Sequence, residues 1–148
     1  MDIKAKNVSI KPEVDFFGEG HDELVVLIND PDGELSKLNK EIKGTAHQAH
    51  DDYKKIHHRD LYDIAKSERY PFLPHMGLGR IRSNSIKQHI KDKSLVNDTF
   101  ERIKQRIKKA AQEVVKESIA ASSSKLSFNK IGVLDLAKQT YIKEWVKG

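Results

Sequence analysis

The chain has 148 residues, 37% of them hydrophobic and 33% charged, with a formal net charge of +5 and no cysteine. This composition predicts one globular domain over 1–148 in the cytoplasm. It excludes disulfides and thiolate metal sites, and no apolar run approaches the roughly 20 residues of a membrane span. The positive charge favours anionic partners such as RNA or nucleotides.

The first part of the chain has the alternation of β-strands. Apolar residues occupy even positions in 7–17, which predicts a strand interrupted near Pro12: Val8, Ile10, Val14 and Phe16. Gly18-Glu19-Gly20 follows as a turn. The continuous apolar run 24–28 is typical of a central strand buried on both faces, and Asn29-Asp30-Pro31-Asp32-Gly33 ends it.

Helical spacing begins at Glu34. Leu35, Leu38 and Ile42 predict a helix that stops at Gly44. A second helix is expected over 46–67, with one apolar face formed by Ala49, Tyr53, Ile56 and Ile64.

The second half alternates strands with one long helix. Pro71 and Pro74 exclude a helix, and 76–81 is predicted as a short strand. The segment 84–97 predicts no element. Asp98-Thr99-Phe100-Glu101 has the pattern of a capping box and begins an amphipathic helix that ends at Ser122. Two strands are expected after it, over 126–136 and 140–146.

This order of elements predicts an α+β fold. We expect a mostly antiparallel sheet of about five strands with two or three helices packed on it. No internal repeat or linker interrupts the chain, so 1–148 is expected to form one domain or half-domain.

The most informative segment lies around His75. Pro74 restricts the preceding residue to extended geometry, so the chain enters the next strand extended with the histidine at its start. Alternation would place His75, Gly77 and Gly79 on one face, where backbone without side chains can be approached closely by a ligand. Arg80 follows and can hold a phosphate with its planar fork of donors.

The segment 74–80, Pro-His-Met-Gly-Leu-Gly-Arg, resembles the Pro-His-x-Thr-Leu-x-Arg motif of the 2′-5′ RNA ligase family within the two-histidine (2H) phosphoesterases. The order of elements is similar as well, because an apolar strand and a helix precede the motif and a long helix and two strands follow it. The resemblance therefore covers nearly the whole chain as a pattern, but only this segment as a specific motif.

The resemblance implies a metal-free acid and base pair acting on a phosphodiester, without any cofactor. In the family, two imidazoles face each other across a groove, one taking a proton and the other protonating the leaving oxygen. The motif hydroxyls bind the phosphate. The implied substrates are 2′,3′-cyclic phosphates and 2′-5′-linked RNA or nucleotides.

This chain departs from the family pattern in two ways. Gly77 stands where the motif has Thr or Ser, and by the family's register this sequence is not expected to contain the lobe that bears the first histidine motif. His21-Asp22-Glu23 is a poor substitute because Glu23 would repel phosphate. Three explanations stay open: a degenerate relative that no longer catalyses, a complementary lobe on another polypeptide, or a homodimer in which each copy supplies one His75.

The resemblance and the residues beside His75 give candidate roles to five residues. His75 would be the general acid or base, and the backbone at Gly77 together with Arg80 would bind the phosphate. Tyr70 and Phe72 would stack on a base, or form core or rim packing. The alternative from another class is a non-catalytic RNA-binding or protein-interaction module on the same scaffold.

Two other groups of residues have competing interpretations. His47, His50 and Asp51 share a helical face and could bind zinc or nickel, but they match no strict ligand pattern, and a solvated helix surface is the commoner reason for such spacing. The long helix has a basic face that could contact an RNA backbone or be an ordinary charged surface, formed by Arg102, Lys104, Arg106, Lys108, Lys109 and Lys116.

Overall fold

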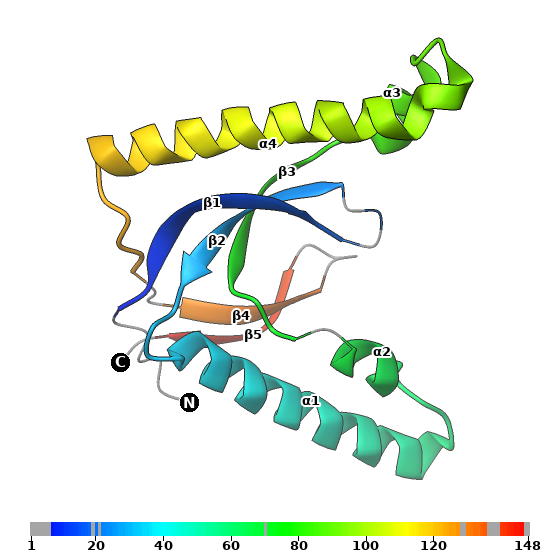
Figure 1. Cartoon of the computed structure of the whole chain (residues 1–148). Coiled ribbons are helices and arrows are strands. Elements are labelled where there is room, and N and C mark those ends of the chain that lie inside the picture. The colour runs from blue at the N-terminus through cyan, green and yellow to red at the C-terminus, as the bar shows by residue number, and fades with distance from the viewer. Residues whose placement is uncertain are drawn as a thin grey trace. The chain divides into compact units, whose positions relative to one another are not determined.

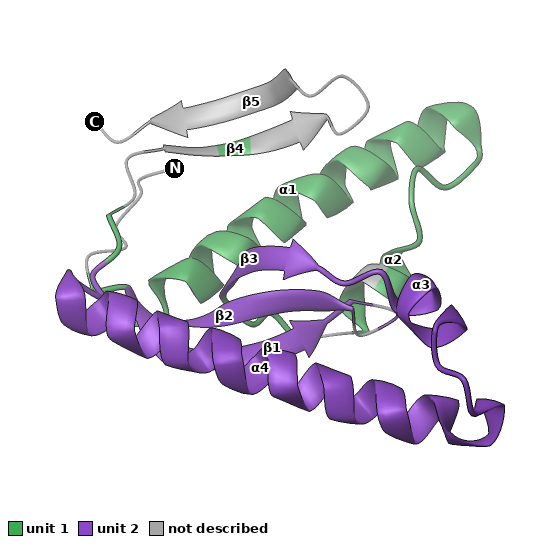
Figure 2. Ribbon diagram, turned by 90° about the horizontal axis from the view of Figure 1, so that it is seen from above, with its two compact units in different colours: residues 1–8, 30–74, 126–148 green, residues 9–29, 75–125 purple. Residues whose placement is uncertain are grey.

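The computed structural model describes residues 7–18, 20, 22–69, 71–127, 130–135 and 140–146, and Figure 1 shows the order of the elements along the chain. The chain divides into two compact units (Figure 2). The sheet unit contains Ser9–Asn29 and His75–Lys125, and the helical-arm unit contains Met1–Val8, Asp30–Pro74 and Leu126–Gly148.

The sheet unit is built on three antiparallel strands. These are β1 (Ser9–Phe17), β2 (Glu23–Asn29) and β3 (His75–Arg80), in the order β1-β2-β3. The predicted central strand is confirmed as β2, whose Val25 and Val26 side chains are almost completely buried. The alternation that predicted β1 places Val14 and Phe16 in the core of this unit.

The long helix α4 (Val96–Ala121) lies along the sheet (Figure 1) and packs against β1. Phe100 is buried in this contact. Lys104 is buried as well, with its ammonium group 5.1 Å from the centre of the Phe16 ring and 5.7 Å from that of Phe100. A cation held over two aromatic faces is attracted by their quadrupoles, so Lys104 does not belong to a solvated basic face.

Short helices fill the region for which the sequence predicted no element. α3 (Ser83–Gln88) and the single 3-10 turn η1 (Lys93–Leu95) precede α4. The Asp92 carboxylate accepts a hydrogen bond from the Ser94 amide at 3.0 Å and so begins η1. The predicted capping box is wrong in detail, because α4 begins at Val96 without a side-chain cap and Asp98 lies in its first turn.

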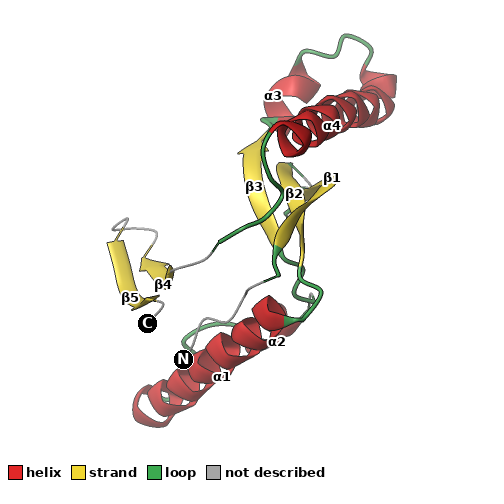
Figure 3. Ribbon diagram, turned by 90° about the vertical axis from the view of Figure 1, so that its left-hand side faces the viewer, coloured by secondary structure: helices red, strands yellow, loops and turns green. Residues whose placement is uncertain are grey.

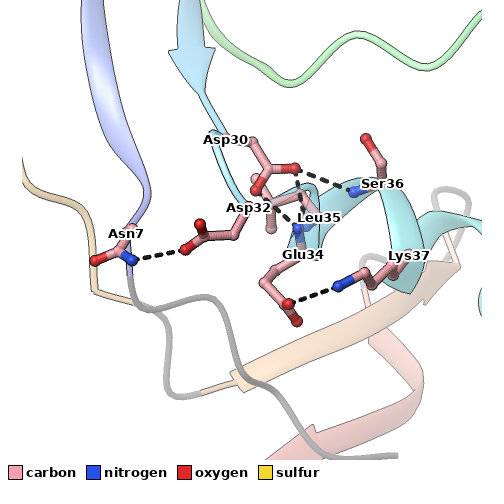
Figure 4. A network of polar contacts seen from close by, with 7 residues as sticks. All are labelled: Asn7, Asp30, Asp32, Glu34, Leu35, Ser36 and Lys37. Atoms are coloured by element: carbon pink, nitrogen blue, oxygen red, sulfur yellow. Dashed lines mark hydrogen bonds and ion pairs between the residues drawn. The ribbon is translucent and has the colours of Figure 1, made fainter.

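The helical-arm unit begins with α1 (Glu34–His57), which Asp30 caps (Figure 4). The Asp30 carboxylate accepts hydrogen bonds from the backbone amides of Glu34, Leu35 and Ser36 at 3.0, 3.0 and 3.3 Å. These amides have no partner within the helix, so the aspartate stabilises its first turn. Gly33 supplies the left-handed turn before it, with a φ of 65°.

Two predicted helix boundaries are wrong. α1 continues through Gly44, because an interior glycine costs only about 1 kcal/mol relative to alanine and does not break a helix as proline does. The helix predicted over 46–67 is in fact the end of α1, a loop that starts at His58, and the short α2 (Ile64–Glu68). His58 ends α1 with a positive φ of 54°.

The two C-terminal strands, β4 (Lys130–Asp135) and β5 (Thr140–Val146), pair with each other as an antiparallel hairpin (Figure 3). The α+β class is confirmed, but the described strands form a three-stranded sheet and a two-stranded sheet instead of one sheet of five. Pairing between distant strands depends on contacts that local periodicity does not encode. No helix in the described ranges is long and apolar enough to cross a membrane.

Candidate functional site

The predicted catalytic residue, His75, is the first residue of β3. It lies opposite Leu27 of β2, and Gly77 lies opposite Val25. Residues that pair across an antiparallel ladder share a face of the sheet, so His75 and Gly77 lie on the same face, as predicted. We call this the His75 face of the sheet.

The His75 imidazole is exposed at the edge of the sheet and contacts one aromatic side chain. Its ring meets the ring of Phe17 edge to face, with centres 5.0 Å apart and planes at 78°. This geometry places the positive edge of one ring against the negative face of the other. The contact orients the imidazole while leaving it within reach of a ligand.

The predicted strip of two glycines is shorter than expected. The pairing of β2 with β3 shifts between Leu24 and Val25, so that Leu24 lies opposite Gly79 while Val25 lies opposite Gly77. A β-bulge of this kind reverses the alternation of the residues that follow it. Gly79 therefore shares the face of Leu24, and Gly77 alone leaves bare backbone on the His75 face.

A carboxylate occupies the space beside this glycine. A Cβ atom built on Gly77 would lie 3.3 Å from Oε1 of Glu23. Glu23 lies opposite Arg80 in the ladder, and the two side chains approach to 4.0 Å between Oε2 and Nη2. Glu23 was not predicted as part of the site, because its place beside Gly77 follows from the strand register and not from any local motif.

Arg80 carries the positive charge on this face. Its Nε lies 3.9 Å from Oδ1 of Asp22, and its side chain is 68% exposed. Both ion pairs are long and solvated, and such pairs contribute little stability. The guanidinium is therefore free to exchange its carboxylate partners for another anion at small cost.

The remaining predicted site residues, Tyr70 and Phe72, do not belong to the sheet unit. Tyr70 lies outside the described residues. Phe72 is 42% exposed and belongs to the helical-arm unit, and its stacking on a base stays a prediction. His89 is the other described histidine of the sheet unit, and its Nδ1 donates to the Ser85 carbonyl at 2.7 Å. Its Nδ1 is thus engaged within its own helical turn.

The histidines of the possible metal site make other contacts. Nδ1 of His50 accepts a hydrogen bond from the Leu61 amide at 3.3 Å, and its Nε2 lies 3.3 Å from Asp60. Both nitrogens of His47 are also occupied, by Glu68 and by Tyr62. Within the described residues, no three histidine or acidic side chains are grouped so as to hold a metal ion. The structure gives the metal interpretation no support.

Two carboxyl groups of the helical-arm unit have lowered pKa values. The hydrogen bond and charge of the Lys54 ammonium, 2.9 Å away, lower the pKa of Asp60. The hydrogen bond from His47 and then the charge of Lys43 lower the pKa of Glu68. These groups favour their ionised forms, which are the forms that hold the loop and α2 beside α1.

The basic face of α4 is less continuous than the sequence predicted. Lys104 is buried, and Nζ of Lys108 lies 3.4 Å from the Asp15 carboxylate of β1. Both side chains therefore fasten α4 to the sheet. The exposed cations of this helix remain available to an anionic polymer, as on many charged helices.

Comparison with known protein families, with curated proteins and with solved structures found no match to this chain. We therefore infer function from two sources. One is the resemblance of 74–80 to the 2H motif, and the other is the set of groups that surround His75.

Proposed function

We propose that this chain is a 2H-type, metal-independent phosphodiester-processing protein of the 2′-5′ RNA ligase kind, acting on RNA ends or 2′,3′-cyclic phosphates. One observation carries the proposal: the exposed His75 imidazole begins an edge strand, is oriented by Phe17 and lies on the same face as the bare backbone of Gly77. Imidazole is the side chain that enzymes use most often as a general acid or base.

The phosphate would approach the backbone at Gly77, where no side chain obstructs it. Arg80 would supply the compensating positive charge through its guanidinium fork. Glu23 competes with the phosphate for both positions, since its carboxylate lies beside Gly77 and 4.0 Å from Arg80. Binding would therefore displace Glu23 towards solvent, a movement that its partly exposed side chain permits.

A second proton-transfer group completes this chemistry. A lone imidazole serves only one end of the reaction, since one group must take a proton while another protonates the leaving oxygen. We assign the second imidazole to a second copy of the chain, or to a complementary lobe on another polypeptide. All six residues of β3 are exposed at the edge of its sheet, which leaves His75 accessible to such a partner.

Hydrolysis of a 2′,3′-cyclic nucleotide by the whole chain, with a metal chelator present, tests the proposal. We expect turnover that His75→Ala abolishes and that His89→Ala leaves unchanged, because His89 follows α3 and its Nδ1 donates to the Ser85 carbonyl of that helix. Turnover per chain should rise with protein concentration if two copies form the site. Equal turnover by the His75→Ala variant would refute the proposal, and no turnover at any concentration would refute a site built from copies of this chain alone.

The position of Glu23 also favours a second candidate function, an RNA-binding or protein-interaction module without catalysis. A carboxylate beside Gly77 opposes the binding of a single phosphate but leaves the exposed cations of α4 free for a polymer. Such a module predicts RNA affinity that falls steeply with salt and survives the His75→Ala substitution. The same variant therefore distinguishes the two functions.

A further inference from the structure

A tyrosine, a histidine and a glutamate form a hydrogen-bonded chain in the helical-arm unit. The hydroxyl of Tyr62 lies 2.8 Å from Nδ1 of His47, and Nε2 of the same imidazole lies 2.7 Å from Oε1 of Glu68. His47 comes from α1, Glu68 ends α2, and Tyr62 lies in the loop between the two helices. We call these three residues the Tyr62 relay.

The direction of the hydrogen bonds follows from the chemistry of the groups. An ionised carboxylate only accepts, so Nε2 of His47 must carry the proton that faces Glu68. The pKa of Glu68 is lowered, chiefly by this hydrogen bond, which favours the ionised form. A neutral imidazole then has an unprotonated Nδ1, which accepts the hydrogen bond that the Tyr62 hydroxyl donates. This is the arrangement of an activated nucleophile, a base and an orienting carboxylate.

The ring of Tyr62 is held in place by two imidazoles. It stacks on His47 with centres 5.9 Å apart and meets His50 edge to face at 5.0 Å. His50 is buried, and its Nδ1 accepts the hydrogen bond of the Leu61 amide, next to Tyr62 in the chain. His50 thus fixes the backbone that presents the tyrosine, and both of its nitrogens are engaged.

The tyrosine also lines a cavity in the same unit. This cavity has a volume of about 740 Å³, and its charged walls are Asp51, Asp60, Asp63 and Lys54. Three carboxylates against one ammonium group repel a phosphate and favour a neutral or cationic molecule. The relay and the His75 face therefore call for ligands of opposite electrostatic character.

We propose that Tyr62 is a base-activated nucleophile that accepts an acyl group from a neutral or cationic ester. The phenolic oxygen attacks the ester carbonyl while His47 Nδ1 takes the phenolic proton. The tetrahedral intermediate then loses the alcohol of the ester, which receives its proton from the His47 imidazolium. The products are Tyr62 O-acyl ester and free alcohol, so no oxidant or further reactant is needed.

The test is acetylation of the whole chain by p-nitrophenyl acetate, with each modified tyrosine located by peptide mass spectrometry. Tyr53 is the internal control, because the hydrogen bond described for its hydroxyl comes from Arg59, a donor that cannot take up the phenolic proton. General-base assistance contributes typically about a hundredfold or more in evolved sites, and we expect Tyr62 to be acetylated at least about tenfold faster than Tyr53. Equal rates at the two tyrosines would overturn the proposal.

Variants separate activation from a structural role. His47→Gln should reduce the Tyr62 rate to that of Tyr53, and Glu68→Gln should reduce it in part. His57→Gln is the matched control, because His57 contacts the Tyr53 ring at the end of α1 and is not in the relay. An ester of choline should react faster than an ester carrying a carboxylate. A Tyr62 rate unchanged by His47→Gln, in a variant with unchanged circular dichroism, would overturn the proposal.

Discussion

The carboxylate of Glu23 lies beside the position that a side chain on Gly77 would take, with its Oε1 3.3 Å from an ideal Cβ at that glycine. In the motif that 74–80 resembles, this position carries a hydroxyl that binds phosphate. A negative charge therefore stands at the point where the family places a phosphate ligand. Glu23 and Gly77 together decide how well the His75 face can bind an anion, and substitutions at these two positions test this directly.

Replacing Glu23 with Gln should strengthen the binding of a 2′,3′-cyclic nucleotide. The substitution removes a like charge and releases Arg80, and exposed charge pairs of this kind are worth about 0.5–1 kcal/mol, or roughly two- to fivefold in affinity. Isothermal titration calorimetry at low salt measures the change. Asp32→Asn is a control that removes the same charge from a residue of the helical-arm unit. Weaker binding by the Glu23 variant would show that the carboxylate is itself a ligand group.

Replacing Gly77 with Thr should restore the missing hydroxyl with a small effect on folding. Threonine favours a strand, and its Cβ requires the flexible, partly exposed Glu23 side chain to move by only a few tenths of an ångström. We therefore expect the free energy of unfolding to change by less than about 1 kcal/mol. The double variant with Glu23→Gln should hydrolyse the cyclic nucleotide faster than either single variant. Urea unfolding and initial rates check both expectations. If the double variant hydrolysed the nucleotide no faster than the original chain, position 77 would not be the phosphate-binding position.

The stability of the helical-arm unit should fall in acid because of Asp60 and Glu68. Their folded-state pKa values are lowered, so each contributes stability that is fully present above the ordinary carboxyl range and is lost as the pH falls through the folded pKa. The double variant Asp60→Asn, Glu68→Gln should lack this contribution. Its melting temperature should therefore differ from that of the original chain near neutral pH and converge with it as the pH falls through the lowered pKa values. If the melting temperatures of the two proteins differed by the same amount from neutral to acid pH, Asp60 and Glu68 would not be the source of the acid sensitivity.

Replacing Phe100 with Ala should destabilise the sheet unit strongly. Its ring is 4% exposed and packs below Lys104 and Lys87, whose ammonium groups lie 5.7 and 4.8 Å from its centre. Removing a buried phenylalanine costs about 3–5 kcal/mol. Val114→Ala on the same helix is the control, because Val114 is 62% exposed and should cost less than about 0.5 kcal/mol. If the two variants lost the same unfolding free energy in urea, Phe100 would not be part of the core of the sheet unit.

Local periodicity predicted the elements whose pattern is complete within a few residues. The alternation of Val14 and Phe16, the apolar run of β2 and the stripe of α4 each appear in the structure as expected. The prediction that the helix stops at Gly44 was wrong, because the low helix propensity of one glycine is outweighed by the other interactions of a long helix. The pairing of β4 with β5 in a two-stranded sheet of their own could not be predicted, since strand pairing is decided between distant segments.

The candidate site was predicted only where the chain itself fixes geometry. Pro74 made the extended start of β3 and the position of His75 readable from sequence. The bulge that moves Gly79 to the other face, and the register that brings Glu23 beside Gly77, depend on the pairing of β3 with β2. The approach of Tyr62 to His47 likewise requires the chain to reverse after His58, and no local sequence pattern predicted that reversal.

The most direct test of the account follows the ring protons of His75 by NMR while cytidine 3′-monophosphate is added to the whole chain. We predict that the His75 signals shift and saturate, that those of His89 stay in place, and that Arg80→Ala abolishes the shift. His75 signals that stay unchanged up to millimolar nucleotide would contradict the claim that a phosphate binds beside this imidazole.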